Sequence, residues 1–278
     1  MNARQAVLWA TRELSALPSP RLEAELLLCG AAGWEKHRLY LQHDAPLPPA
    51  VPSLFERHVA RRKAREPLQH ILGECGFLGR MFLCGPGALV PRPETEILLQ
   101  AFLDVLPPNP SRLLDVGTGS GVVGISLSLA FPGAFVAGTD VSPDALRLAA
   151  ANRRLHGADG FVPVLGDLAA PFRLLARFDG IVANLPYVAS GEIAGLEPEV
   201  RDHEPREALD GGPDGLGLVR RLVAEAPPLL APGGVLALEL SPAQTRTVSG
   251  LLGRKGWSSV RTVPDLSGRD RVVLALRG

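Results

Sequence analysis

Cysteine is scarce in this sequence, and its few cysteines form no recognisable ligand set. The three cysteines, Cys29, Cys75 and Cys84, are odd in number, and their spacing matches no metal-binding motif. A chain of 278 residues can bury an adequate hydrophobic core without disulfides. We therefore expect no metal site, and we expect the reducing environment of the cytoplasm.

The sequence also lacks a charge excess and a long apolar run. Its 29 Lys and Arg residues balance 29 Asp and Glu residues. Proteins that grip nucleic-acid backbones usually carry a basic excess, so we expect no stable nucleic-acid binding. The most apolar stretch, Val122–Gly138, is interrupted by serine, proline and glycine and is no candidate for a membrane span. The N-terminal residues do not resemble a signal peptide, and we expect no membrane association.

The chain divides into parts with different hydrophobic patterns. Residues 1–72 show helical spacing of leucines and no strand signal, which predicts a small all-α bundle. Closely spaced glycines between short apolar pieces in residues 73–90 predict a β-hairpin or an extended linker. In residues 91–278 a helix precedes alternating strands and helices, which predicts a mostly parallel sheet with helices on both faces. The expected strands are Arg112–Val116, Ala134–Gly138, Phe161–Leu165, Gly180–Ala183, Val235–Leu240 and Val272–Leu276.

A glycine-rich turn follows the first of these strands. The run Asp-Val-Gly-Thr-Gly-Ser-Gly over residues 115–121 leads into a helix, and its glycines let a ligand approach the backbone. Asp140 ends the second strand, where a carboxylate can accept hydrogen bonds from ribose hydroxyls. Asp167 follows the third strand and is either an acceptor for an adenine amino group or an ordinary exposed loop residue. Together these features predict a site for a nucleoside-containing cofactor.

Other interpretations of this turn are less consistent with the sequence. Gly119, Gly121 and Gly124 fit the dinucleotide-binding fingerprint. Asp115 disfavours it, because a carboxylate repels an anionic pyrophosphate but suits the cationic S-adenosylmethionine. A phosphate-binding P-loop is excluded, since no Lys-Ser or Lys-Thr pair follows the glycines. A turn with no ligand is the remaining alternative, and Asp140 argues against it.

The tetrapeptide Asn-Leu-Pro-Tyr, residues 184–187, ends the fourth strand at the edge where open α/β sheets bind ligands. A planar NH₂ group presents two hydrogens, which the side-chain oxygen of Asn184 and the backbone carbonyl of Leu185 can accept. Pro186 restricts Leu185 to an extended conformation, and the ring of Tyr187 can pack on a flat amide or base. Two acceptors would hold a weakly nucleophilic nitrogen in line with a methyl donor. An Asn-Pro turn without function is the alternative.

Three further segments extend the pattern. Residues 66–73 read Glu-Pro-Leu-Gln-His-Ile-Leu-Gly, residues 91–96 read Pro-Arg-Pro-Glu-Thr-Glu, and residues 204–216 contain Glu-Pro-Arg-x-Ala-Leu-x-Gly-Gly-x-Asp-Gly-Leu. With the glycine turn and the Asn-x-Pro-Tyr tetrapeptide, these segments resemble the release-factor glutamine methyltransferases, the HemK/PrmC family. The resemblance runs from the N-terminal helices to the last strand, and Pro-Arg-Pro-Glu-Thr-Glu is its most specific piece.

The resemblance implies methyl transfer from S-adenosylmethionine, with S-adenosylhomocysteine as product, to the N5 amide nitrogen of glutamine in the Gly-Gly-Gln loop of peptide chain release factors. It implies a Rossmann-like class I methyltransferase domain over residues 91–278, with a seven-stranded sheet. Residues 1–72 would help to recognise the release factor, and Pro91–Glu96 would help close the cofactor pocket. We expect a monomer. The residues expected to bind the cofactor are Asp115, Gly117, Thr118, Gly119, Ser120, Gly121, Asp140, Asp167, Leu168 and Asn184. Those expected to hold the amide are Asn184, Leu185, Pro186 and Tyr187.

One departure leaves a second substrate open. The family's usual tetrapeptide is Asn-Pro-Pro-Tyr, and Leu185 replaces the first proline here. The backbone carbonyl at that position is kept, so the amide clamp is retained. Asn-Leu-Pro-Tyr is also the tetrapeptide of ribosomal RNA adenine dimethyltransferases, which makes RNA adenine N6-methylation the alternative. The neutral charge, the helical N-terminal part and the Pro-Arg-Pro-Glu-Thr-Glu segment argue against RNA.

Overall fold

The computed structural model describes residues 1–172, 177–253 and 256–278, and these residues form two compact units. The first unit contains Met1–Glu74 together with Glu197–His203, and the second contains Cys75–Leu196 together with Glu204–Gly278. The chain therefore leaves the second unit once and returns to it. No helix in the described part of the chain is long and apolar enough to cross a membrane.

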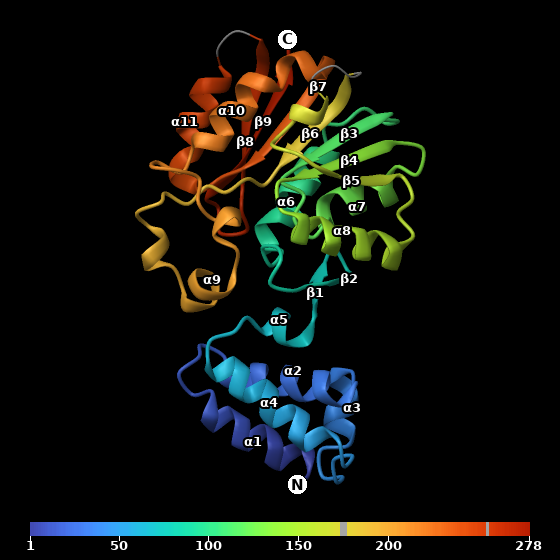
Figure 1. The fold of residues 1–278 in the computed structure, drawn as a ribbon, viewed down its shortest axis with the longest axis vertical. Helices are drawn as coiled ribbons and strands as arrows, with labels where there is room; N and C mark the ends of the chain where they lie inside the picture. The colour runs from blue at the N-terminus through green and yellow to red at the C-terminus, as the bar shows by residue number, and fades with distance from the viewer. Residues whose placement is uncertain (173–176, 254–255) are drawn as a thin grey trace. The chain divides into compact units, whose positions relative to one another are not determined.

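The first unit is built from helices, as its leucine spacing predicts (Figure 1). Asn2 and Gln5 form a capping box at the first helix, and Gly33 ends the second in a left-handed conformation. The core of the unit includes Leu27, Leu28 and Phe55, each 0% exposed. Its helices are α1 (Ala3–Glu13), α2 (Pro20–Ala32), α3 (Lys36–Leu41), α4 (Val51–Lys63), α5 (Leu68–Leu72) and α9 (Pro198–His203).

A buried arginine holds α9 within this unit. Arg62 on α4 is 5% exposed, and its Nη1 donates to Oε1 of Glu199 at 2.9 Å and to the Glu66 carbonyl at 3.1 Å. Its Nε donates to Glu23 on α2. Removing one partner of a buried ion pair leaves an uncompensated charge, so this contact is costly to break.

A short hairpin spans the point in the sequence where the second unit begins. Strand β1 (Glu74–Phe77) pairs with β2 (Arg80–Leu83) through a turn at Leu78 and Gly79, which have φ angles of 45° and 72°. Positive φ at both central residues matches the twist of a two-residue hairpin. The hairpin expected from the glycine spacing is therefore present.

The second unit contains a seven-stranded sheet in the order β5-β4-β3-β6-β7-β9-β8. The five strands β3 to β7 are parallel, and β9 pairs antiparallel with β7 and β8. The strands are β3 (Arg112–Val116), β4 (Phe135–Asp140), β5 (Phe161–Leu165), β6 (Phe178–Ala183), β7 (Leu230–Glu239), β8 (Trp257–Pro264) and β9 (Asp270–Arg277). The strand β8 had no apolar run to reveal it, because it lies at the sheet edge and is largely exposed.

Helices cover both faces of the sheet, which confirms the predicted architecture (Figure 1). Successive residues of β3 face opposite sides: Leu113 belongs to the apolar core that includes residues of α6 and α7, and Leu114 to the core that includes residues of α10 and α11. The helices are α6 (Pro93–Leu103), α7 (Val122–Ala130), α8 (Pro143–His156), α10 (Gly217–Glu225) and α11 (Pro242–Leu252). Short 3₁₀ helices occupy Ala170–Phe172, Ile193–Gly195, Arg206–Ala208 and Pro227–Leu229.

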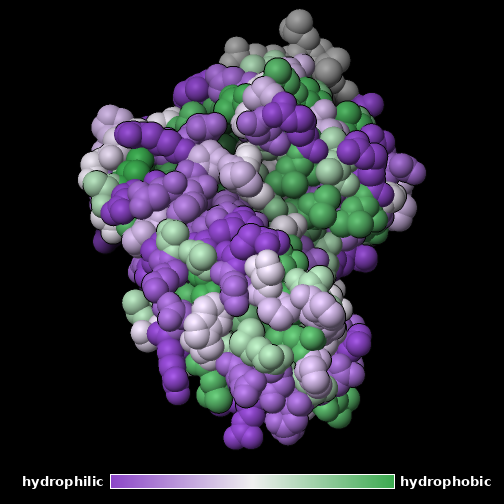
Figure 2. Space-filling view, turned by 60° about the horizontal axis from the view of Figure 1, so that its bottom comes forward, coloured by the Kyte–Doolittle hydropathy of each residue, from purple (hydrophilic) through white to green (hydrophobic). Residues whose placement is uncertain are grey.

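The surface of the molecule mixes polar and apolar side chains. Figure 2 shows hydrophilic residues over much of one face, with a group of hydrophobic residues right of its centre and others scattered over the face. The exposed large hydrophobic residues include Leu78, Met81 and Leu83 on the hairpin and Leu155 on α8.

We predict that Arg62→Ala lowers the free energy of unfolding by about 3 kcal/mol, because Glu23 and Glu199 lose their buried partner. Urea denaturation followed by far-ultraviolet circular dichroism measures the change. The matched control is Arg57→Ala on the same helix, whose exposed side chain bonds to Ser53 and which should cost less than about 0.5 kcal/mol. Equal effects of the two substitutions would contradict the assigned role of Arg62.

Candidate active site

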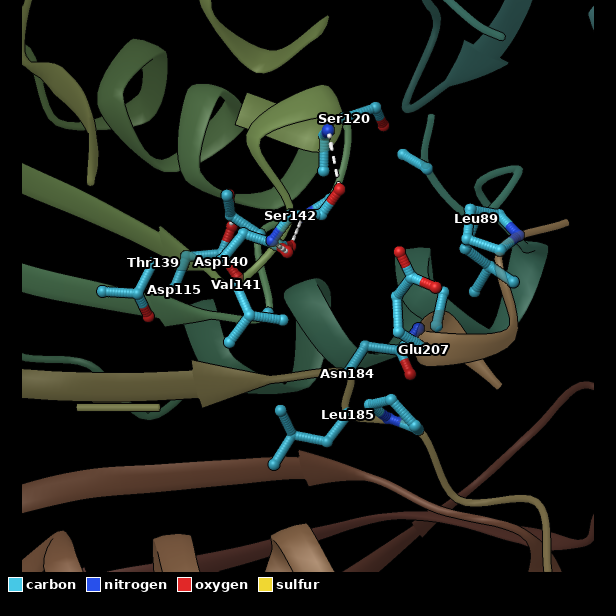
Figure 3. A pocket seen from close by; sticks show the side chains of 18 of the residues that line it. Leu89, Asp115, Ser120, Thr139, Asp140, Val141, Ser142, Asn184, Leu185 and Glu207 are labelled. Carbon is cyan, nitrogen blue, oxygen red and sulfur yellow. Dashed lines mark hydrogen bonds between the residues drawn. The ribbon is translucent and has the colours of Figure 1, made fainter. Parts of the chain in front are cut away.

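A cavity lies at the carboxyl ends of the central parallel strands (Figure 3). Every residue expected to contact cofactor or substrate lines this cavity, except Gly121 and Tyr187. The lining residues that were expected are Asp115, Gly117, Thr118, Gly119, Ser120, Asp140, Asp167, Leu168, Asn184, Leu185 and Pro186. Residues far apart in the sequence therefore meet at one edge of the sheet, as parallel strands require.

The glycine turn adopts a backbone that other residues rarely enter. Gly117, Gly119 and Gly121 have φ angles of 73°, 55° and 84°. A Cβ on Gly117 would lie 3.1 Å from the side chain of Leu185, whereas a Cβ on Gly119 would have only Ala88 within 4 Å. Gly117 is thus needed because Leu185 packs against it, and Gly119 keeps the cavity free of a side chain.

Asp115 stabilises this turn from within. Its Oδ2 accepts hydrogen bonds from the Thr118 hydroxyl at 2.6 Å and from the Gly124 N–H at 2.9 Å. Burial raises the pKa of Asp115 to about 7. The sequence suggested only an electrostatic preference for a cationic ligand, and the structure adds a structural role, because the carboxyl group joins the turn to the start of α7.

Asp140 contacts the turn from the neighbouring strand. Its two oxygens accept from the Gly119 N–H and the Ser142 N–H, each at 2.9 Å. Burial raises the pKa of Asp140, although these backbone donors oppose the shift. Since a carboxylate oxygen can accept more than one hydrogen bond, Asp140 retains acceptor capacity toward a ligand.

Asn152 is a site residue that the sequence did not reveal. It is 0% exposed on α8; its Oδ1 accepts from the Leu83 N–H at 2.7 Å, and its Nδ2 donates to the carbonyls of Leu83 at 3.1 Å and Ser120 at 2.9 Å. One amide thus links the hairpin, α8 and the glycine turn. A single asparagine within a helix carries no local signal of such a role.

The segment after β5 forms another part of the wall. Asp167 is half exposed, and its Oδ2 accepts from Arg221 on α10 at 2.7 Å. Leu168 is buried with a φ of 49°, an unusual conformation for leucine. The expected acceptor Asp167 therefore has a cationic partner that the sequence did not indicate.

The side chain of Asn184 is anchored at one end only. Its Nδ2 donates to Oγ1 of Thr95 at 3.0 Å, and the Thr95 hydroxyl donates to Oε2 of Glu239 at 2.8 Å. Asn184 is half-buried, and its Oδ1 accepts no hydrogen bond from the described residues. An acceptor oxygen at the cavity wall is thus available to a ligand.

The rest of the tetrapeptide is held by close backbone packing. Leu185 is 4% exposed and fills the space beside Gly117. A Cβ on Gly211 would lie 2.5 Å from the Pro186 carbonyl oxygen, and one on Gly215 would lie 2.2 Å from the Tyr187 carbonyl oxygen. Gly211 and Gly215 are therefore required because their backbone lies too close to the tetrapeptide for a side chain to fit. Burial raises the pKa of Tyr187 to about 12.

Two other expected segments meet beside the cavity. The Arg92 guanidinium donates to Oε1 of Glu204 at 2.6 Å, which joins the Pro-Arg-Pro-Glu-Thr-Glu segment to the Glu-Pro-Arg segment. Pro91, Thr95 and Glu207 line the cavity. Figure 3 shows Glu207 on the side of Asn184, and this carboxylate was not predicted from the sequence.

Two solved structures share this fold. A methyltransferase from Pyrococcus furiosus aligns with a TM-score of 0.53 at 20% identity, over 80% of this chain and 96% of its own. The 16S rRNA N2 G1207 methyltransferase of Thermus thermophilus, solved with AdoMet and guanosine, aligns with a TM-score of 0.53 at 21% identity, over 74% of this chain and 50% of its own. The fold of this chain is therefore that of the class I methyltransferases.

Sequence similarity identifies the family within this class. Residues 5–73 match the PrmC N-terminal domain and residues 94–196 the methyltransferase small domain. The release factor glutamine methyltransferase of Geobacter sulfurreducens is 43% identical over 91% of this chain and 88% of its own length. That of Moorella thermoacetica is 42% identical over 100% of this chain and 99% of its own. The chain belongs to the release factor glutamine methyltransferase family, a family of S-adenosylmethionine-dependent enzymes, which confirms the resemblance seen in the sequence.

We predict that Asn152→Ala lowers the free energy of unfolding by about 2 kcal/mol, because buried backbone groups of Leu83 and Ser120 lose their partner. It should also weaken S-adenosylhomocysteine binding about tenfold by loosening the glycine turn. Isothermal titration calorimetry measures the affinity. Arg147→Ala, at an exposed position on the same helix, is the control. Unchanged affinity in a destabilised Asn152→Ala protein would contradict the link to the turn.

Proposed function

We propose that the cavity binds S-adenosylmethionine through the residues expected from the sequence. The open space above Gly119 admits a ligand against the turn, and Asp140 retains lone pairs for two ribose hydroxyls. Leu168 supplies an apolar surface for the adenine, with Asp167 near its edge. The residues present thus fit this cofactor. When bound, the cofactor supplies a methyl group carried on a positively charged sulfur. The sulfur becomes the neutral thioether of S-adenosylhomocysteine once it has lost that methyl group.

We propose further that the acceptor is the side-chain amide of glutamine in the Gly-Gly-Gln loop of release factors. The observation that carries this proposal is the Oδ1 of Asn184 at the cavity wall, which accepts no hydrogen bond from the residues that the structure describes. Together with the Leu185 carbonyl it can accept both hydrogens of a planar NH₂ group. The amide nitrogen then forms a bond to the methyl carbon as the carbon–sulfur bond breaks, and one N–H proton leaves to water. Acceptors beside the nitrogen stabilise the positive charge that develops there.

The proposed reaction also indicates the protein substrate, the roles of the parts of the chain and the cellular compartment. The names of the relatives point to release factors as the substrate. We propose that residues 1–72 recognise the release factor, that residues 73–90 link them to the catalytic residues 91–278, and that the enzyme acts as a cytoplasmic monomer. RNA adenine N6-methylation remains the second candidate, because Asn-Leu-Pro-Tyr also suits the amino group of a base.

The test is transfer of labelled methyl from S-adenosylmethionine to three acceptors in parallel. These are wild-type release factor, a variant with Gly-Gly-Ala in place of Gly-Gly-Gln, and under-methylated ribosomal RNA. We expect label on the wild-type factor alone, and we expect Asn184→Ala to lower kcat about 100-fold because one of two acceptors is lost. Label on the RNA alone would overturn the assigned substrate, and undiminished transfer by Asn184→Ala would overturn the assigned mechanism.

Leu185→Pro gives this chain the tetrapeptide usual in the family. We predict that kcat stays within about threefold of the wild-type value, since the carbonyl that clamps the amide is kept. The free energy of unfolding should fall by about 1–2 kcal/mol, because the buried leucine side chain beside Gly117 is lost. Steady-state kinetics on release factor and urea denaturation measure the two quantities. A 100-fold loss of kcat would contradict this prediction and would show that the packing of the Leu185 side chain is needed for the reaction.

A further inference from the structure

The hydrogen bonds behind Asn184 run through three elements and end in the protein core. Asn184 follows β6, Thr95 lies on α6, and Glu239 ends β7. Thr95 is 4% exposed and Glu239 is 1% exposed, so water cannot readily replace either partner. Nδ2 of Asn184 lies 3.0 Å from Oγ1 of Thr95, and Oγ1 of Thr95 lies 2.8 Å from Oε2 of Glu239.

This chain of hydrogen bonds has a direction. A threonine hydroxyl has one proton, and Thr95 donates it to Glu239. Only the lone pairs of Thr95 then face Asn184, so only the NH₂ end of the amide can pair with them. A flipped amide would set its oxygen against those lone pairs and expose an NH₂ group to the cavity. Such an NH₂ group would repel the NH₂ of a substrate.

We propose that Thr95 and Glu239 are positioning residues, which fix the Asn184 amide with its oxygen toward the acceptor nitrogen. They thereby make the site an acceptor of hydrogen bonds, suited to an NH₂ group. This inference rests on the proposed function, because it concerns the end of Asn184 that meets the substrate.

This direction belongs to the carboxylate form of Glu239, which has no proton to donate to Thr95. Burial raises the pKa of Glu239 to about 7, with Arg271 and Arg92 opposing the shift and Glu94 adding to it. The second oxygen, Oε1, is buried and has no hydrogen-bond partner among the described residues, so a proton placed there would lack an acceptor. In the carboxylate form, which prevails above a pH of about 7, Oε2 accepts the hydrogen bond from the Thr95 hydroxyl.

Glutamine at this position reverses the preferred direction. In Glu239→Gln, an NH₂ placed at the Oε1 position would be buried without an acceptor, which is unfavourable. The amide is better satisfied when its NH₂ donates to Thr95. The Thr95 hydroxyl is then released to donate to Asn184, which favours the flipped amide. Glu239 does not line the cavity, so the substitution acts on the reaction through Thr95 and Asn184.

Four variants test the proposal by kcat on release factor and by the Kd of S-adenosylhomocysteine. Glu239→Gln and Thr95→Val should each lower kcat about 10- to 100-fold while the Kd stays within about threefold. Thr95→Ser keeps the hydroxyl and should recover kcat to within about threefold of wild type. Thr245→Val is the matched control, since this threonine is also buried and hydrogen-bonded but lies on α11. Wild-type kcat in Glu239→Gln, or a Kd that rises as much as kcat falls, would overturn the proposal.

A second readout does not depend on methyl transfer. In the ¹⁵N-labelled protein, the side-chain NH₂ of Asn184, assigned with Asn184→Ala, should show one proton protected from exchange by Thr95. Thr95→Val should remove this protection, and Thr95→Ser should keep it. An unchanged signal in Thr95→Val would overturn the positioning role. If the wild-type enzyme does not methylate release factor, the proposed function fails, and these signals still decide whether Thr95 orients Asn184.

Discussion

The sharp turn between β3 and α7 is the constraint on which the rest of the site depends. Three glycines with positive φ let the backbone turn directly beneath the cavity, and none of them can carry a side chain without strain. The glycines have no side chains with which to hold the turn, so contacts with neighbouring elements stabilise it. Asp115 binds it from β3, Asp140 from β4 and Asn152 from α8.

The Asn-Leu-Pro-Tyr tetrapeptide, which faces the substrate in the proposed function, is likewise held by close backbone packing. The tetrapeptide after β6 has glycines packed against its carbonyls, and Gln244 on α11 donates to the Tyr187 carbonyl at 2.8 Å. Among the described residues, the side-chain oxygen of Asn184 at the cavity wall accepts no hydrogen bond, and its side-chain nitrogen is held by Thr95. In the proposed function, the fixed oxygen of Asn184 opposite the glycine turn would hold a weak nitrogen nucleophile in line with a methyl donor without a strong base.

Much of this arrangement could be predicted because the informative residues are adjacent in the sequence. The glycine run, the acid at the end of β4 and the Asn-Leu-Pro-Tyr tetrapeptide each follow a strand, and parallel strands bring their ends to one edge. The single-residue partners could not be predicted. The contact of Asn152 with Ser120, of Arg221 with Asp167 and of Glu239 with Thr95 joins residues far apart in the sequence. The edge strand β8 lacked a signal because it buries little apolar surface.

The account is tested most directly by locating the transferred methyl group. Release factor incubated with this enzyme and S-adenosylmethionine can be digested and its peptides sequenced by tandem mass spectrometry. The account predicts one added methyl group on the side-chain nitrogen of the glutamine in the Gly-Gly-Gln loop. A methyl group on any other residue, or on an oxygen, would contradict the proposal that Asn184 and Leu185 hold a planar amide in the cavity.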